Sequence, residues 1–236
     1  VMKVFMVDVA KCSGCYNCQI ACKDEHCGND WAPYAAPQPN SGQFWCAVKQ
    51  REHGQVPKVR VEYWPVFGGQ DPAIADYAPE VLMEREDGLQ VIMPEKAKGR
   101  RDIAERFEGV YYNEKLDVPQ ACTGCAHLVD EGKLPHCVDL CATGALRFGD
   151  AEEFASEMEA AETLTPPSKG APRVFYLNRP HLFIAGDVWD PKDNEIIEGA
   201  KVMLTMPNGE TVETLTDDFG DFYFRGIDEG TYGLAI

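Results

Sequence analysis

The chain has 236 residues and a formal net charge of −17, from 22 basic and 39 acidic side chains. Such an acidic surface excludes nucleic acids and anionic membranes as favoured partners, because neither attracts negative charge. The sequence has no apolar run of about 18 residues, so it predicts no transmembrane helix. Residues 1–10 lack the basic and apolar regions of a secretory signal. We therefore expect a cytoplasmic protein.

The predicted elements are short and mixed in type. Segments rich in Val and Phe indicate strands, and Asp150 followed by Glu153 resembles a capping box at the start of a helix. In chain order, we expect strands at 3–9, 59–67, 89–93, 110–112 and 144–148, helices at 19–26 and 151–162, and loops at 30–45 and 68–80.

The last third of the chain differs in composition and in its pattern of apolar residues. Residues 163–181 are expected to form a linker, because their first half is rich in Pro, Ser and Gly. Short alternating apolar stretches separated by Gly, Asp and Asn then fill residues 182–236. This pattern is typical of an antiparallel β-sandwich.

Eight of the ten cysteines fall into two runs. In each run three residues separate the last two cysteines, and two residues separate the first two. The first run has the spacing of a bacterial ferredoxin. The runs contain Cys12, Cys15, Cys18 and Cys22, and then Cys122, Cys125, Cys137 and Cys141.

Ferredoxin spacing predicts that the two runs exchange their last ligands, since the fourth cysteine of such a run binds the neighbouring cluster. We therefore expect two [4Fe–4S] clusters. Cluster 1 would be bound by Cys12, Cys15, Cys18 and Cys141. Cluster 2 would be bound by Cys122, Cys125, Cys137 and Cys22.

Other interpretations of the cysteines stay open at this point. Two-residue spacings also suit a pair of structural zinc sites. Cys27 and Cys46 lie outside both runs, and we expect them to be buried free thiols. A third metal site would need further ligands, for which His26, His53 and nearby acidic residues are the candidates.

Residues 3–150 resemble the iron–sulfur subunits of the dimethyl sulfoxide reductase superfamily of molybdenum and tungsten enzymes. The resemblance is carried by residues 8–12, by Cys122-Thr-Gly-Cys-Ala-His, and by Cys141-Ala-Thr-Gly-Ala. That family carries a second ferredoxin unit between its first and last motifs. Here Ala97 and Arg100 stand where two of its cysteines would be.

The resemblance thus predicts a degenerate middle unit over residues 63–118. No cysteine occurs between Cys46 and Cys122, so we expect this unit to keep its strands and hold no cluster. We expect Arg100 or Arg101 to occupy part of the emptied space.

The C-terminal segment resembles a transthyretin-like or carboxypeptidase-regulatory-like Greek-key domain, whose expected role is docking or stability. The fold class is therefore expected to be α+β. We expect a ferredoxin-like domain over 1–162, with its degenerate unit, and then an all-β sandwich over 182–236 whose final strand lies beyond Ile236.

Residues 24–26, 85–88, 94–99 and 125–128 are similar to the small subunits of pyrogallol–phloroglucinol transhydroxylases. This resemblance implies an electron-transfer subunit of a heteromeric enzyme that acts on polyphenols of the pyrogallol and catechol type. It implies molybdopterin guanine dinucleotide, with molybdenum or tungsten, on a large catalytic partner subunit only. We expect no catalytic residue on this chain.

Three other functions stay open. The clusters could be structural and redox-silent, since a transhydroxylation needs no net electrons. The partner could instead be a reductive catechol dehydroxylase. A free-standing ferredoxin is the third alternative.

Overall fold

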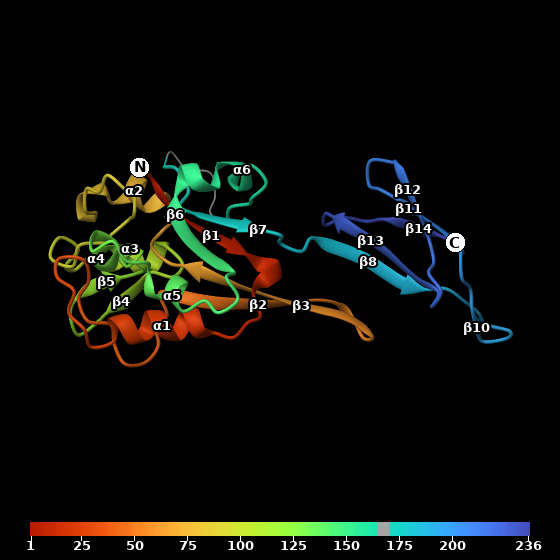
Figure 1. Cartoon of the computed structure of the whole chain (residues 1–236), viewed down its shortest axis with the longest axis horizontal. Coiled ribbons are helices and arrows are strands. Elements are labelled where there is room, and N and C mark those ends of the chain that lie inside the picture. Colours follow the sequence, from red (N-terminus) through yellow and green to blue (C-terminus); the bar gives the residue numbers. More distant parts are fainter. Residues whose placement is uncertain (165–169) are drawn as a thin grey trace. The chain divides into compact units, whose positions relative to one another are not determined.

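The computed structural model describes residues 1–164 and 170–236 and has a mixed, strand-rich α+β fold, in agreement with the expected class (Figure 1). The chain divides into two compact units. The first comprises Val1–Gln50 and Glu62–Arg179, and the second comprises Arg51–Val61 and Pro180–Ile236. In the described residues, no helix is long and apolar enough to cross a membrane.

A three-stranded sheet organises the first unit. Its central strand, β1 (Lys3–Asp8), pairs antiparallel with β6 (Leu146–Asp150) and parallel with β7 (Val174–Leu177). Because Val7 pairs with Leu146, the end of β1 that leads into the first cysteine run lies beside the start of β6, just after the second run. The sheet thus brings the beginning of one run to the end of the other.

Both faces of β1 are buried, which explains its continuous apolar sequence. Phe5 packs between the rings of Phe67 and Phe148, with ring centroids 4.6 and 4.8 Å away, on the face that also contacts the cysteines. The opposite face, through Met6, packs against Phe154 and other residues of a smaller apolar cluster.

Short helices complete the cysteine-bearing part. Helix α1 (Asn17–His26) confirms the expected helix at 19–26, and it packs against α5 (His136–Asp139). Helix α4 (Ala126–Asp130) begins directly after Cys125. A helix of the first unit therefore begins within each of the two cysteine runs.

The middle segment is held together by apolar side chains. Its elements are α2 (Ala73–Tyr77), the 3₁₀ turn η2 (Pro79–Val81), α3 (Arg101–Arg106), β4 (Tyr111–Asn113) and β5 (Val118–Gln120). Ile74, Ala97 and Ile103 have no exposed surface and share one core cluster. The predicted strand at 89–93 is wrong, since these residues make an isolated bridge between Leu82 and Ile92 in the described structure.

The expected placement of the arginines is also wrong. Arg100 pairs with Glu80 and Asp102, and Arg101 pairs with Glu114, all on partly or largely exposed side chains. A guanidinium buried without a carboxylate would be costly, whereas Ile and Ala fill an apolar space without that cost. The space is therefore filled by aliphatic residues.

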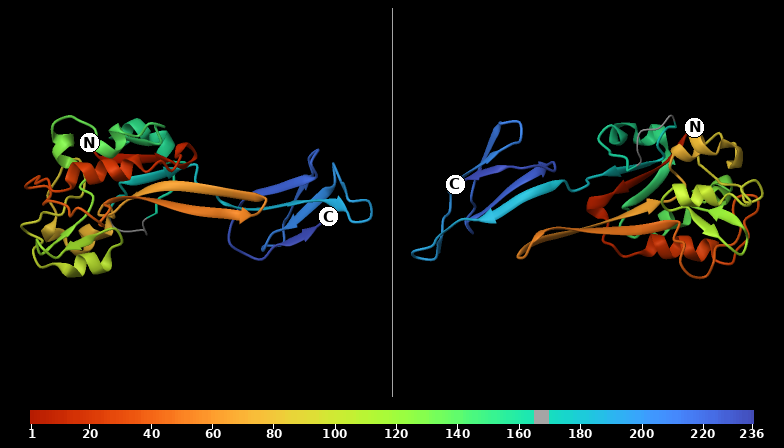
Figure 2. Two further views of the ribbon diagram at one scale, coloured as in Figure 1. Left: turned by 90° about the horizontal axis from the view of Figure 1, so that it is seen from below. Right: turned by 180° about the vertical axis from the view of Figure 1, so that it is seen from behind.

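A long hairpin joins β2 (Cys46–Gln55) to β3 (Lys58–Phe67), and its two strands run side by side (Figure 2). The expected strand at 59–67 is confirmed as β3. Strand β2 was missed because its polar sequence lacks apolar alternation.

The second unit is built of strands, with no helix among its described residues. Its strands are β8 (Leu182–Asp187), β9 (Trp189–Asp190), β10 (Glu195–Ile196), β11 (Lys201–Thr205), β12 (Thr211–Leu215), β13 (Asp221–Ile227) and β14 (Gly233–Ala235). The sheets β12-β11-β14 and β13-β8 share a core formed by Val202, Leu204, Phe222 and Phe224. The hairpin tip belongs to this unit, where Lys58 pairs with Asp221.

Two further expectations differ from the structure. The helix expected at 151–162 is a 3₁₀ turn, η3 (Ala151–Phe154), followed by the short helix α6 (Ala155–Met158). Within the expected linker at 163–181, residues 174–177 form β7, because their apolar side chains pack into the clusters on both faces of the sheet. Residues 165–169 of that linker lie outside the described part of the chain.

Candidate iron–sulfur sites

Four thiols from both runs surround one small cavity of about 20 Å³. Its lining includes Cys12, Cys15, Cys18 and Cys141, which is the first predicted ligand set. Burial raises the pKa of the Cys12 thiol, and the neighbouring Cys18, Cys141 and Cys15 raise it further. The structure therefore brings the last cysteine of the second run to the first three of the first run.

The other four thiols, Cys22, Cys122, Cys125 and Cys137, are buried together. Burial raises the pKa of Cys22 well above its usual value, and Cys122 and Cys137 add to this rise. Burial also raises the pKa of Cys125 well above its usual value, and Cys137 and Cys22 raise it further. Cys22 thus lies with the second run, although it belongs to the first in sequence.

Both cysteine loops turn through left-handed backbone conformations. Gly14 has φ +67° and Gly124 has φ +63°, and the next turn residues, Tyr16 and Cys125, are also left-handed. A Cβ atom on Gly14 would lie 2.5 Å from the ring of Tyr63, so glycine is also required there by space. The tight loops turn main-chain N–H groups toward the sulfur atoms.

These N–H groups provide a test of whether the thiols suit a cluster. The N–H of Gly124 donates to Cys122 Sγ over 3.3 Å, and the N–H of Leu146 donates to Cys141 Sγ over 3.3 Å. The N–H groups of Gly14 and His136 donate to the thiols of Cys12 and Cys125. Thiolates bound to iron accept such bonds, and these bonds tune the cluster. The residues present therefore fit [4Fe–4S] clusters.

A single-ion site is a different arrangement. In the part of the chain that the structure describes, no group of three or more His, Cys, Asp and Glu residues is placed to hold one metal ion.

A carboxylate and two histidines lie beside the second thiol group. Glu25 Oε1 accepts a hydrogen bond at 2.9 Å from Nε2 of His127, and its Oε2 lies 3.0 Å from Nδ1 of His136. The ring of Trp31 stacks on His127 with centroids 4.3 Å apart. Burial lowers the pKa of the nearby His26 to about 4, so this ring is neutral at pH 7. Sequence spacing gave no signal for this network.

Two residues next to the first cysteine run have ordinary polar partners. Lys23, which follows the first run, donates from Nζ to the carbonyl oxygens of Pro39 and Gly42 at 2.5 and 2.7 Å. Cys27 is half-buried and donates to Asn40 over 3.3 Å, so the expectation that it is buried is wrong. It lies where α1 ends and the polar loop begins, which leaves its side chain accessible.

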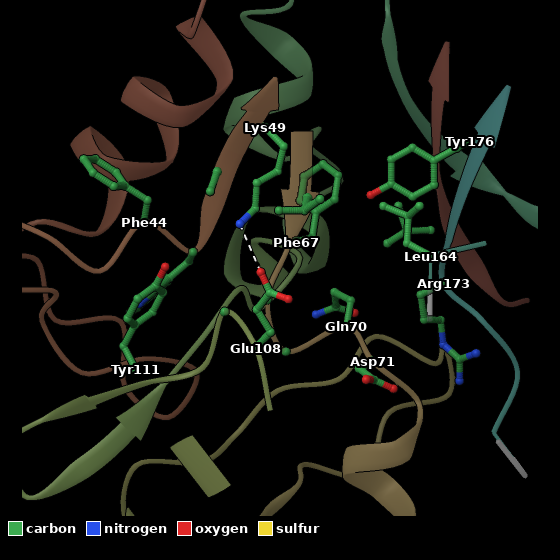
Figure 3. Close-up of a pocket in the computed structure, with 17 residues that line it drawn as sticks. Phe44, Lys49, Phe67, Gln70, Asp71, Glu108, Tyr111, Leu164, Arg173 and Tyr176 are labelled. Carbon is green, nitrogen blue, oxygen red and sulfur yellow. Dashed lines mark hydrogen bonds and ion pairs between the residues drawn. The ribbon is translucent and has the colours of Figure 1, made fainter. Parts of the chain in front are cut away.

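A larger cavity, of about 310 Å³, opens elsewhere in the first unit (Figure 3). Aromatic side chains of Phe44, Phe67 and Tyr111 line it, together with an ion pair between Lys49 and Glu108, whose atoms are 3.0 Å apart. Among the described residues that line it there is no cysteine. It is therefore separate from both thiol groups.

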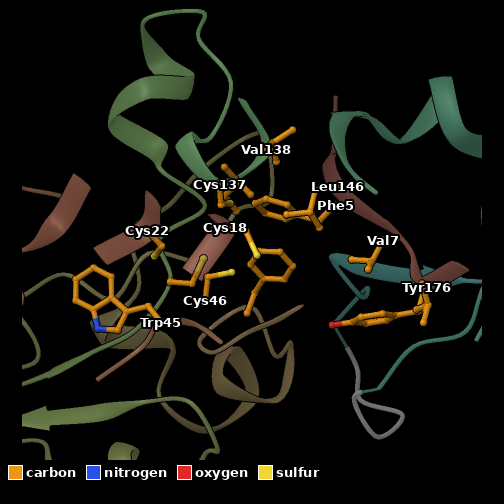
Figure 4. Packing of buried hydrophobic residues seen from close by; sticks show 14 of the residues in the cluster. Phe5, Val7, Cys18, Cys22, Trp45, Cys46, Cys137, Val138, Leu146 and Tyr176 are labelled. Carbon is orange, nitrogen blue, oxygen red and sulfur yellow. The ribbon is translucent and has the colours of Figure 1, made fainter. Parts of the chain in front are cut away.

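Several of the thiols are part of the main apolar core (Figure 4). Cys18, Cys22, Cys46 and Cys137 lie in one buried cluster with Trp45 and other apolar residues. Cys46 is 1% exposed, which confirms the expectation of a buried thiol. Its position between the two groups could not be read from its spacing.

Comparisons with known proteins agree with this chemistry. A family model described as a 4Fe-4S dicluster domain matches residues 70–151. The small subunit of pyrogallol hydroxytransferase from Pelobacter acidigallici is 33% identical over 98% of this chain and 89% of its own length.

More distant relatives cover less of the chain. A tetrathionate reductase subunit from Salmonella typhimurium is 25% identical over 76% of this chain and 73% of its own length. A component of the anaerobic dimethyl sulfoxide reductase from Escherichia coli is 28% identical over 76% of this chain and 86% of its own length.

The fold, the thiol groups and the matching domain define an iron–sulfur protein of the 4Fe–4S class. The protein belongs to the family of iron–sulfur small subunits of molybdopterin oxidoreductases. Such relatives are subunits of larger enzymes, which implies a large catalytic partner.

Proposed function

We propose that this chain carries two [4Fe–4S] clusters and transfers electrons for a molybdopterin enzyme. The first cluster would be held by Cys12, Cys15, Cys18 and Cys141, and the second by Cys22, Cys122, Cys125 and Cys137. The crossed grouping of the thiols is the observation that carries the proposal. When bound, the clusters would supply one-electron redox chemistry, which the surrounding N–H donors would tune.

The middle segment supports the proposed count of two clusters. Its core is filled by Ile74, Ala97, Ile103 and further aliphatic side chains, which offer no ligand to iron. Two clusters therefore form the whole relay that we propose for this chain.

The architecture that we propose has two domains. Residues 1–162 would form a ferredoxin-like domain with a cluster-free unit at 63–118, and 163–181 would connect it to a transthyretin-like sandwich at 182–236. The shared core of the two small sheets supports the sandwich. The parallel pairing of β7 with β1 means that part of the connection also belongs to the first sheet.

The partner that we propose is a large subunit holding molybdopterin guanine dinucleotide with molybdenum or tungsten, in a cytoplasmic heterodimer or larger assembly. We propose a polyphenol of the pyrogallol or catechol type as its substrate, because a similar chain is the small subunit of a pyrogallol hydroxytransferase. Catalysis would occur on the large subunit.

Metal analysis and reduction of the anaerobically purified complex test this function. We expect about eight iron atoms per small subunit, together with molybdenum or tungsten. Dithionite should bleach the visible absorbance and produce reduced-cluster EPR signals. Zinc in place of iron, or about twelve or more iron atoms per chain, would contradict the two-cluster assignment.

A structural role for the clusters is the second candidate, since transfer of a hydroxyl group between polyphenols needs no net electrons. Clusters that stay oxidised at all accessible potentials, in a complex that turns over at full rate, would favour it. Incubation with a catechol and a reductant tests whether the partner is a reductive catechol dehydroxylase, because that enzyme would release water and the deoxygenated phenol.

A further inference from the structure

Cys46 belongs to neither cysteine run, yet it contacts both thiol groups. Its thiol lies within hydrogen-bond reach of Cys18, in the first group, and of Cys137, in the second, and all three pack in one buried cluster. Because a sulfur bound to iron carries no proton, the Cys46 S–H would be the donor in both pairs. Its main-chain N–H donates to the thiol of Cys22, also in the second group. Figure 4 shows the labelled side chains of Cys18, Cys46 and Cys137 in the same part of the core.

The local structure holds this residue firmly in place. Cys46 is the first residue of β2 and is 1% exposed, and the preceding Trp45 is also 1% exposed. The carbonyl oxygen of Trp45 accepts a hydrogen bond from the N–H of Gly68 over 3.0 Å. Both ends of the β2–β3 hairpin base are thereby fixed, so that the Cys46 thiol stays between the two groups.

A donor at this position has a definite electrostatic effect. Hydrogen bonds to cluster sulfur atoms stabilise the reduced, more negative state and raise the reduction potential. A thiol has one proton, so a bond to Cys18 is made at the expense of a bond to Cys137. The donor can therefore follow the electron from one cluster to the other.

We propose that Cys46 is a positioning residue whose thiol is a hydrogen-bond donor shared by the two clusters, and that it raises the reduction potential of both. This inference rests on the two-cluster function proposed above. Cys46 itself does not bind iron in this scheme, because each group already contains four thiols.

Space filling is the competing explanation for a buried cysteine. If Cys46 only fills space, its removal should weaken folding and leave the potentials unchanged. Cys27 provides a matched control, because it is the other cysteine outside the runs and its thiol donates to Asn40. Serine at position 46 keeps a donor, whereas valine fills the space without one.

The experiment measures midpoint potentials by EPR-monitored titration of the complete complex. The unaltered complex comes first: if it lacks about eight iron atoms and two reducible clusters, the proposed function fails, whatever Cys46 does. In Cys46→Ala and Cys46→Val we expect both potentials to fall at unchanged iron content. In Cys46→Ser the fall should be smaller, and in Cys27→Ala both potentials should stay at their native values.

Three results would overturn the inference. The first is native potentials for both clusters in Cys46→Val, and the second is an equal shift in Cys46→Val and Cys46→Ser. The third is a loss of clusters from every variant at position 46, serine included, because a shared donor is not needed for iron binding. If Cys46→Ala alone loses its clusters, the valine and serine variants decide the question.

Discussion

Glu25 and His127 form a hydrogen bond of 2.9 Å although 102 positions separate them in the sequence. Glu25 lies in α1, which follows the first cysteine loop, and His127 lies in α4, which follows Cys125. The bond therefore ties together the two helices that follow the cysteine loops.

Replacing this carboxylate should lower stability. Glu25→Ala leaves the buried His127 Nε2 without its acceptor, at a cost of roughly 1–3 kcal/mol in the free energy of unfolding. Anaerobic denaturant unfolding measures this change. The control is Glu131→Ala. This variant removes an exposed ion pair with Lys133 at the end of α4, the helix that contains His127. Equal midpoints for the two variants would show that the bond contributes little.

Crossed ligation makes a paired prediction for serine variants. Cys141→Ser should abolish the same EPR signal as Cys12→Ser, because both side chains line the first cavity. Cys22→Ser should abolish the same signal as Cys122→Ser, because these thiols lie together. Each variant should lose about half of the iron. If Cys22→Ser instead resembles Cys12→Ser, each cluster is bound by its own run.

The middle segment should respond to substitution as an apolar core and not as a metal site. Ile103 has no exposed surface, so Ile103→Ala should cost roughly 2–5 kcal/mol of unfolding free energy. Iron content should stay at its native value. Val56→Ala, at a side chain 88% exposed, is the control and should change stability by less than about 0.5 kcal/mol. Loss of iron from the folded Ile103→Ala protein would contradict the absence of a cluster there.

His26 predicts a pH dependence of stability. Burial lowers its pKa in the folded state to about 4, from 6.5 in the unfolded chain, so the unfolded state binds more protons between these values. Stability should therefore fall as the pH drops below about 6.5, by roughly 2 kcal/mol at pH 5. Denaturant unfolding of the native protein and His26→Gln, measured at both pH values, tests this. An equal loss of stability between these pH values in the native protein and in His26→Gln would contradict this prediction.

Exposed apolar side chains near the clusters predict where the large subunit docks. Ile20 and Leu140, each within a cysteine run, are 59% and 46% exposed, and Cys15 is the exposed thiol of its group. Electron transfer needs a close approach between the clusters and the large subunit. A double variant, Ile20→Lys with Leu140→Lys, should therefore lower co-purification of the large subunit several-fold, at native iron content. Leu215→Lys, at a side chain 63% exposed in the second unit, is the control. An undiminished yield of complex for the double variant would place the interface elsewhere.

The sequence was most informative where covalent spacing limits geometry. The two cysteine runs predicted which thiols lie together, because a short loop can direct its thiols in few ways. Segments rich in Val and Phe likewise predicted β1 and β3, and short alternating apolar stretches predicted strands after residue 182. Contacts that depend on distant partners were missed: β2 carries a polar sequence, and Glu25 and His127 give no local signal of their pairing.

The arginine prediction failed for a different reason. Absence of cysteine at Ala97 and Arg100 indicated a missing ligand, but it did not indicate what fills the space. That depends on Ile74 and Ile103, which come from separate helices and meet only in the folded chain. The desolvation cost of a guanidinium then leaves Arg100 at the surface with its carboxylates.

The aliphatic core of the middle segment bears on how the subunit matures. Aliphatic contacts form as soon as the polypeptide is synthesised, whereas cluster sites wait for iron and sulfide to be delivered. Under the two-cluster proposal, the middle segment therefore gains its native contacts regardless of the iron supply of the cell. In the two-cluster arrangement that we propose, this segment also has no acid-labile sulfide to lose on exposure to oxygen.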